Sequence, residues 1–428
     1  MAMLIHFRAL HNLSHSVIFI FTFLQYGYCN NTSISNQNCN LINNILNFKL
    51  PKCKVNCFVK NFGRITVNLQ CKRENLSVAL NVLRAEGVFD VDILQLNQNS
   101  NFNLLQKGIF DRMNIRRLDL SQNSLSKDNT SDETGFVGTY SSESLKIDKS
   151  SLISDAFHLG IIDSNAFDAI KSLEYLDLSR NRLTTESLDS MSKLENLKIL
   201  NLESNNVSSI PEGIFKNNIN LISLNLASNS ICYLPQNALN ETKRILEHLN
   251  LGHNCLAFVP ASNLRNFQKL AHLSLNANRI RGKLANLQFM NMPKLKELDL
   301  SSNSLTGWNS LTFMNVPILE RLSLADNDVQ DVNAMQLQLF EHLSRLDLSG
   351  NKIEKIPSFA FKEMKNIELI NLDRNSIKSL ETSAFSSLWN LQTLSIQNNK
   401  LQNLQRNCFD SLGRLRSLLM ANNSVSFL

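Results

Sequence analysis

The chain has 428 residues, of which 43% are hydrophobic and 19% charged, with only 7 prolines and 13 glycines. This composition excludes a long disordered chain, and the length exceeds what one compact core usually supports unless the protein grows by adding repeats. The net charge of +6 is mild, and basic residues are interleaved with acidic ones along the chain. Neither nucleic acid nor an anionic membrane is therefore indicated as an obligate partner.

The N-terminus has the layout of a secretory signal peptide. Arg8 precedes an apolar run from Val17 to Leu24 that is too short to span a bilayer, and Gly27 and Cys29 supply small residues for cleavage. We expect residues 1–29 to be removed. Secretion agrees with the presence of N-x-S/T glycosylation triplets. These triplets begin at Asn30, Asn31, Asn75, Asn129, Asn206, Asn240 and Asn422.

Residues 30–74 contain an even cluster of cysteines around the apolar stretch Ile65, Val67 and Leu69. In a secreted protein such a cluster indicates a small unit held together by disulfide bonds. A zinc site is the alternative, but no nearby histidine joins the cysteines and secretion favours oxidation, so we expect no metal. The cluster consists of Cys39, Cys53, Cys57 and Cys71.

The rest of the chain repeats one unit, which reads L-x-x-L-x-L-x-x-N-x-L. From Asn181 onward its asparagine recurs every 24 or 25 residues. The alternating leucines share one face of a short strand, and stacked strands form a parallel sheet with a continuous core. The asparagines are Asn99, Asn123, Asn181, Asn205, Asn229, Asn254, Asn278, Asn303, Asn327, Asn351, Asn375, Asn399 and Asn423.

Each asparagine offers one acceptor and two donors, so we expect it to pair the backbone groups of the turn that leaves the strand and to bridge successive turns. A second apolar set, such as Ile356, Pro357, Phe361 and Ile367, should pack the return segment against the strand. The outer side is then short-helical or irregular. The apolar stripe of the central repeats is expected to be core. Its members are Phe289, Met292, Phe313, Val316, Leu337 and Phe340.

The regular period fails between Asn123 and Asn181. Leu145 to Ile147 still predicts a strand, whereas Ser126 to Ser144 is polar and contains glycine and serine, which is typical of a flexible excursion. Loops on a repeat scaffold are often binding elements, but a surface insertion without a function has the same composition.

No enzyme motif is present, and we expect no catalytic residues and no cofactor. Asp, Asn or Ser recurs at the middle exposed position of the strands, for example at Asp177, Asp299 and Asp347. We interpret this stripe as the solvated face of the sheet, because an open concave surface offers a carboxylate pair little desolvation.

One cluster of polar side chains is a candidate binding site. His248 and His272 occupy equivalent positions on neighbouring strands and should stack at about strand spacing, and His253 is expected on the same inner face. Ordinary solvated histidines are the alternative. The candidate binding residues are Glu247, His248, Asn250, His253, His272, Ser274 and Asn276.

Three further cysteines lie within the repeats. Cys232 and Cys255 follow consecutive asparagines and could form a disulfide bond, but their Cα separation cannot be read from sequence, and two free thiols are favoured. Cys408 stands before a core aromatic, where Ala360 and Ala384 stand in other repeats, so a buried, inert thiol is predicted.

The repeats resemble the extracellular leucine-rich-repeat family, of the kind found in Toll-type receptor ectodomains, chaoptin-like adhesion proteins and Slit-like proteins. The resemblance implies an α/β fold, a right-handed horseshoe-shaped solenoid with a parallel β-sheet on the concave face and an irregular, short-helical convex side. It covers residues 75–428, with about 14 repeats and an irregular part at 126–172. It also implies that residues 30–74 are a cysteine-rich N-terminal cap, with Cys39 bonded to Cys57 and Cys53 bonded to Cys71.

No second cysteine cluster follows the repeats, so a C-terminal cap is absent, and the stop at Leu428 within a repeat is expected of a fragment. Membrane association would then come only through sequence beyond Leu428. The expected function is non-enzymatic: a scaffold, secreted or on the extracellular face of the plasma membrane, that binds a protein ligand or cell-surface protein on its concave face. Adhesion, receptor signalling and innate recognition fit this expectation. The alternative is a structural protein of the extracellular matrix with the same fold.

Overall fold

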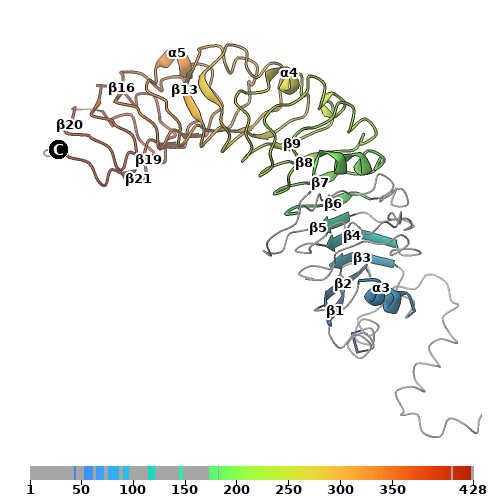
Figure 1. Cartoon of the computed structure of the whole chain (residues 1–428). Helices are drawn as coiled ribbons and strands as arrows, with labels where there is room; N and C mark the ends of the chain where they lie inside the picture. Colours follow the sequence, from blue (N-terminus) through green and yellow to red (C-terminus); the bar gives the residue numbers. More distant parts are fainter. Residues whose placement is uncertain are drawn as a thin grey trace, which may run out of the picture.

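The computed structural model describes residues 43–44, 53–60, 64–71, 76–85, 90–95, 114–120, 144–147, 173–181, 183–405 and 408–425. These residues form a curved solenoid of parallel strands with few helices, in which the main sheet lines the inner side of the arch (Figure 1). The predicted horseshoe of leucine-rich repeats is confirmed. The expected signal peptide at 1–29 and most of the irregular part at 126–172 lie outside the described residues.

Neighbouring strands of the main sheet follow one another along the chain, one for each repeat. The first two strands pair antiparallel, and every later pair is parallel. The predicted strand around Leu145 is present as β5, between β4 and β6. The strands of this sheet are β1 (Cys53–Lys60), β2 (Arg64–Cys71), β3 (Asp90–Gln95), β4 (Asn114–Leu120), β5 (Ser144–Ile147), β6 (Tyr175–Asp177), β7 (Ile199–Asn201), β8 (Ser223–Asn225), β9 (His248–Asn250), β10 (His272–Ser274), β12 (Glu297–Asp299), β14 (Arg321–Ser323), β15 (Arg345–Asp347), β17 (Leu369–Asn371), β19 (Thr393–Ser395) and β21 (Ser417–Leu419).

Short strands and helices form the outer side of the arch. Helix α5 begins at Asn333, whose side chain accepts the backbone N–H of Gln336, while the Gln336 side chain accepts that of Asn333. This reciprocal cap satisfies two donors of the first turn. The remaining elements are β11 (Arg281–Leu284), β13 (Ser304–Trp308), β16 (Lys355–Ile356), β18 (Ser379–Leu380), β20 (Asn403–Leu404), α3 (Leu76–Ala85), α4 (Ala261–Leu264), α5 (Ala334–Leu337) and the 3₁₀ helices η2 (Thr185–Met191) and η3 (Asn240–Thr242).

The core lies between the main sheet and the outer segments. Leu224, Leu249 and Leu273 stand in register on adjacent strands, and each is at most 2% exposed. On the outer side Phe289 stacks on Phe313 with ring centroids 5.6 Å apart, as the apolar stripe predicted. Each coil therefore buries its apolar residues against the next coil rather than within itself.

The repeated asparagines bridge successive coils, as expected. Asn205 Nδ2 donates to the Leu178 carbonyl of the preceding coil at 2.8 Å and to its own Leu202 carbonyl at 3.0 Å. Its Oδ1 accepts the backbone N–H of Leu183 at 3.0 Å. The same pattern recurs at Asn254 and Asn351, so one side chain satisfies backbone groups of two turns in each repeat.

The cysteines of the predicted cap are only partly within the described residues. Cys53 lies opposite Cys71 in the antiparallel register of β1 and β2, and Cys57 is buried and takes part in a disulfide bond. Cys39 lies outside the described residues. The pairing of Cys39 with Cys57 and of Cys53 with Cys71 stays a prediction.

Two free thiols at Cys232 and Cys255 are contradicted, because these residues form a disulfide bond between consecutive coils. Stacking brings their Cα atoms to 4.3 Å although they are 23 residues apart in sequence. Spacing along the chain does not reveal such proximity. The prediction for Cys408 is confirmed, since this thiol is free and buried, and burial raises its pKa.

Candidate functional site

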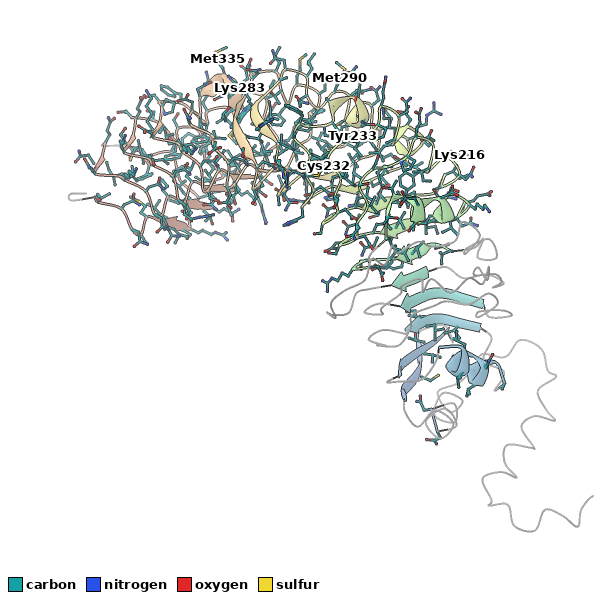
Figure 2. All side chains as sticks on the ribbon, viewed as in Figure 1. Lys216, Cys232, Tyr233, Lys283, Met290 and Met335 are labelled. Carbon is teal, nitrogen blue, oxygen red and sulfur yellow. A yellow bond between two sulfur atoms is a disulfide. The ribbon has the colours of Figure 1, made fainter. Side chains whose placement is uncertain are left out.

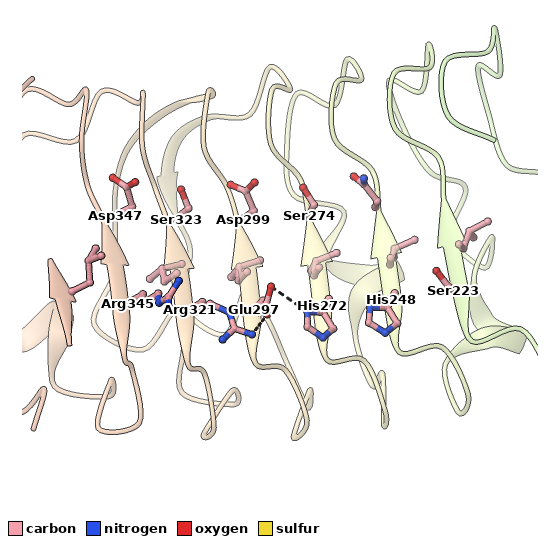
Figure 3. A pocket seen from close by; sticks show the side chains of 17 residues that line it. Ser223, His248, His272, Ser274, Glu297, Asp299, Arg321, Ser323, Arg345 and Asp347 are labelled. Carbon is pink, nitrogen blue, oxygen red and sulfur yellow. Dashed lines mark ion pairs between the residues drawn. The ribbon is translucent and has the colours of Figure 1, made fainter. Parts of the chain in front are cut away.

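The concave face carries a hollow of about 600 Å³ that extends over the main-sheet strands from β8 to β15, with Leu369 of β17 at its far end. Each of these strands is a triplet with a buried central leucine, so its first and third residues project from the sheet. Figure 3 shows the two resulting rows of side chains. The first row consists of Ser223, His248, His272, Glu297, Arg321 and Arg345, and the second row of Asn250, Ser274, Asp299, Ser323 and Asp347.

The expected histidine stack is present at one end of the first row. The rings of His248 and His272 lie 4.4 Å apart with an angle of 8° between their planes. Their Cα atoms are register partners on β9 and β10, so the parallel pairing of the strands sets this separation. Two imidazoles this close repel each other when both are protonated, and the stack therefore favours the neutral forms.

An ion-paired chain continues the first row from the histidines. His272 Nδ1 lies 3.2 Å from Glu297 Oε2, and Glu297 also pairs with the guanidinium of Arg321. Arg345 follows Arg321 in register on β15, is exposed, and has no ion pair among the described residues. Along the row, the stacked histidines are followed by Glu297, whose charge Arg321 compensates, and then by the unpaired Arg345.

The pKa of each imidazole is lowered from its usual value. At His248 partial burial is the largest cause, and repulsion from His272 adds to it, whereas Glu247 acts in the opposite direction. At His272 burial again comes first, followed by Arg321 and Lys296. Contact with Glu297 alone would favour a protonated His272, but Arg321 compensates the same carboxylate. Both rings are therefore neutral at neutral pH.

The second row shapes the turn that follows each strand. Asn250 Oδ1 accepts the backbone N–H of Gly252 at 3.0 Å, and Asp347 Oδ1 accepts that of Ser349 at 2.9 Å. In the same way, Asp299 Oδ1 accepts the backbone N–H of Ser301, two residues further along the chain. Asp and Asn are common at this position because their side chains accept such local N–H donors.

The interpretation of this stripe as the solvated face of the sheet holds for its half-exposed members but is incomplete. Asp177, which belongs to the same stripe, is 2% exposed. Its Oδ1 accepts the Ser179 N–H at 2.8 Å, and its Oδ2 accepts Asn201 Nδ2 at 2.9 Å. The stripe bonds turns and neighbouring strands, and a pattern of polar residue types does not distinguish that role from solvation.

The predicted binding residues separate into two groups. His248, Asn250, His272 and Ser274 line the hollow. Three others do not. Glu247 precedes β9, Asn276 follows β10 and accepts a hydrogen bond from the Ser274 hydroxyl at 2.9 Å, and His253 lies in the turn before Asn254 with a φ of 52°.

His253 was expected on the inner face, and the structure places it in the turn after β9, exposed and outside the lining of the hollow. Conversely, Glu297, Arg321 and Arg345 line the hollow and were not predicted. They occupy the same strand position as His248 and His272, one, two and three strands further along. Extending the histidine register along the repeats would have found them.

Other kinds of site are not found in the part of the chain that the structure describes. No group of three or more His, Cys, Asp or Glu side chains there is arranged to hold a metal ion. Within the same residues, no helix has the length and hydropathy needed to cross a membrane.

Comparison with known proteins identifies the repeat. The family described as "Leucine rich repeat" matches residues 155–207, 195–245, 282–333, 341–388 and 366–425, which together make up more than half of the chain. No curated protein matches the sequence as a whole.

Solved structures share the fold at low identity. The APL1 leucine-rich repeat domain is similar with a TM-score of 0.58 and 23% identity over 79% of this chain and 76% of that one. Toll, in the Toll–Spatzle complex from Drosophila, has a TM-score of 0.56 and 15% identity over 88% of this chain and 57% of that one. The PEPR1–AtPEP1 structure has a TM-score of 0.55 and 20% identity over 86% of this chain and 46% of that one.

Proposed function

Because this chain belongs to the leucine-rich-repeat family, we propose that it is a non-enzymatic extracellular recognition scaffold whose concave face binds a protein partner. The observation that carries the proposal is the first row, in which stacking of coils gathers imidazole, carboxylate and guanidinium groups over one hollow. Polar groups held on a rigid sheet supply orientation and specificity to an interface. A stable protein interface needs roughly 800 Å² on each side, which corresponds to several adjacent strands.

The structural neighbours support a protein as the partner. Toll is solved in complex with Spatzle, described as a hub in development and innate immunity, and PEPR1 with AtPEP1. LRIM1 is solved in complex with APL1C. By analogy of fold, a role in signalling, adhesion or innate recognition is proposed for this chain.

Secretion is part of the same proposal. Removal of residues 1–29, oxidation of Cys39, Cys53, Cys57 and Cys71, and glycosylation are expected of an extracellular protein. Asn206, Asn240 and Asn422 are exposed, as a glycosylated asparagine must be. N-terminal sequencing, peptide mapping without reduction and glycosidase treatment of the protein recovered from culture medium test these points. Free thiols at the four cysteines would contradict the proposed cap.

The binding proposal is tested against an array of the secreted and cell-surface proteins of the same organism. We expect a binder whose affinity falls at least tenfold, or about 1.4 kcal/mol, when Arg345 is changed to Glu. The matched control is Lys365→Glu, which makes the same charge change at an exposed residue before the concave strand β17. Binders that respond equally to both variants, or only to Lys365→Glu, would exclude the concave face.

The histidine pair gives a second measurement on the same binder. Protonation of His248 or His272 adds positive charge to the first row, so affinity should change as the pH falls through their lowered pKa values. The double variant His248→Gln, His272→Gln should remove this pH dependence. An unchanged dependence would take the histidines out of the site. Assembly of the chain with copies of itself and with no other protein would instead favour the structural alternative.

A further inference from the structure

Charge is distributed unevenly along the solenoid. Residues 243–296 contain nine Lys and Arg but one acidic residue, Glu247, which gives +8. The whole chain carries +6, so all remaining residues together sum to −2. The expectation that basic and acidic residues are interleaved is therefore wrong for these coils, and averaging over the whole chain concealed the difference.

The cations of these coils are also unpaired. The structure describes every residue from 243 to 296, and of the nine Lys and Arg there only Lys296 forms an ion pair, with Glu320 at 2.8 Å. The other eight have no acidic partner within ion-pair distance among the described residues. The pKa of Lys243 is lowered, first by burial and second by repulsion from Arg265. Uncompensated charge of one sign destabilises the fold slightly but attracts a ligand of opposite sign.

Three of these cations form one exposed face, which we call the cationic strand face: Arg279, Arg281 and Lys283. They alternate with Ile280 and Leu284, which are 2% and 4% exposed. All three cations are exposed, and their spacing in an extended chain puts them within about 13 Å of one another. The register partner of Arg281 on β13 is the uncharged Ser304, so no neighbouring acid neutralises the face.

Exposed aromatic side chains lie on the two coils before the cationic strand face. The segments after the ladder asparagines are hydrogen-bonded to each other, with Cys255 N donating to Ile231 O at 3.1 Å and Arg279 N donating to Leu256 O at 3.0 Å. On these segments Tyr233 is 64% and Phe258 is 66% exposed. Tyr233 and Lys283 are labelled in Figure 2.

The disulfide between Cys232 and Cys255 ties the same two coils together beside the aromatic residues. It reduces the freedom of the backbone that presents Tyr233 and Phe258. A rigid surface loses less conformational entropy on binding. The edge of the solenoid formed by the cationic strand face, Tyr233 and Phe258 is therefore preorganised for a ligand. The cations, the aromatic rings and the disulfide all follow ladder asparagines and lie beyond the concave strands.

We propose that this edge binds a linear sulfated polysaccharide, with anionic groups on Arg279, Arg281 and Lys283 and a sugar ring against Tyr233 or Phe258. Guanidinium groups bind anionic oxygens through paired N–H donors, and a row of three neighbouring exposed cations suits a polymer with repeated anions. The exposed aromatic rings require a ligand that also presents an apolar face. A sulfated polysaccharide has both features and occurs outside the cell, where the protein is proposed to act.

The test uses a heparin octasaccharide and the full chain, with the dissociation constant measured at several salt concentrations. The triple variant Arg279→Gln, Arg281→Gln, Lys283→Gln should bind at least tenfold more weakly. Its dependence of log Kd on log salt should be shallower by about two to three, roughly one for each lost ionic contact. The matched control is Lys352→Gln, Lys362→Gln, Lys378→Gln, which removes the same charge from cations that are ion-paired elsewhere. The control should bind within twofold of the unchanged protein.

A second pair of variants tests the aromatic part. Tyr233→Ser with Phe258→Ser should weaken binding while leaving the salt dependence unchanged, because no ionic contact is lost. Arg281→Gln alone removes one guanidinium group and should weaken binding, with a salt dependence shallower by about one. It serves as the measurement if the triple variant has a lower thermal midpoint than the control.

Four results would overturn the proposal. These are equal weakening in both triple variants, equal binding of fully desulfated heparin, tighter binding of a single-stranded oligonucleotide of the same charge, and loss of affinity only when Lys243, Arg244 and Arg265 are changed. The variants Arg345→Glu and His248→Gln should leave heparin affinity unaltered. This separates the edge from the concave site, so either proposal can fail without the other.

Discussion

Residues 243–296 and residues 297–405 belong to the same solenoid but differ in net charge and in the number of ion-paired cations. Each part contains nine Lys and Arg, but the first has one acidic residue and the second has thirteen. In the second part five of the nine cations are ion-paired, whereas in the first only one is. Both parts have the same buried leucines and the same asparagine bridges. Core and surface are therefore specified independently in each coil.

The largest expected effect tests whether the two parts share one core. Leu249→Asp and Leu346→Asp each place a charge at a position that is at most 2% exposed, and each should cost about 4 kcal/mol or more. Urea unfolding of the secreted variants, or their yield if they fail to fold, measures this. Asn250→Asp is the control and should be tolerated, because its Oδ1 still accepts the Gly252 N–H. Unequal losses at the two leucines would break the comparison.

Cys255 of the first part is bonded to Cys232 in the coil before it, and removing this bond should sharpen the difference between the two parts. Cys232→Ser with Cys255→Ser should lower the free energy of unfolding by about 3 kcal/mol, because the cross-link restricts the unfolded chain. Denaturant curves with and without reductant check it, since the double variant should lose part of the response to reductant and keep only the part that comes from the N-terminal cysteines. Cys408→Ala removes a free thiol and should leave the reductant response intact.

The asparagine bridges should be equally important in both parts. Asn254→Ala leaves the Leu226 carbonyl and the Ile231 N–H without this partner, and Asn351→Ala does the same in the second part. Each change should cost about 2 kcal/mol, measured by thermal or urea unfolding. A much smaller cost in one part would mean that water replaces the amide there.

The smallest expected effect concerns pH and the boundary between the two parts. The pKa values of His248 and His272 are lowered in the folded protein, so the unfolded chain binds more protons below neutral pH. The stability of the neutral pair is present above the usual histidine pKa near 6.5 and is lost as the pH falls through the lowered values. His248→Gln with His272→Gln should flatten this dependence in urea midpoints between about pH 5 and 7.5. A steeper loss of stability on acidification in the variant than in the unchanged protein would contradict this prediction.

Residue spacing was sufficient to predict the elements that depend on neighbours within one repeat. The strand triplets, the buried leucines, the asparagine bridges and the buried phenylalanines all follow from a period that the chain itself displays. The stacking of His248 on His272 was predicted because both occupy one register position. The prediction stopped at the histidines only because Glu297 and Arg321 are different residue types at the same position.

Other features needed the arrangement of several coils in space. The residue before each bridging asparagine adopts a positive φ. Ser204 at 57°, His253 at 52° and Arg374 at 56° do so although these three residues are not glycine. Hydrogen bonds to the next coil hold that conformation, as when Ser204 N donates to Ala227 O at 2.9 Å. Residue type alone did not indicate this conformation.

The sequence by itself determined the repeated unit, its core and the direction of stacking, because these follow from apolar periodicity and from an amide that satisfies nearby backbone groups. Tertiary structure decided which side chains meet across coils. The Cys232–Cys255 bond, the ion pair of Glu297 with Arg321 and the unpaired cations around Arg281 all depend on distances between residues more than twenty positions apart. Such distances are set by the packing of whole coils, and the packing is a property of the stack rather than of any one repeat.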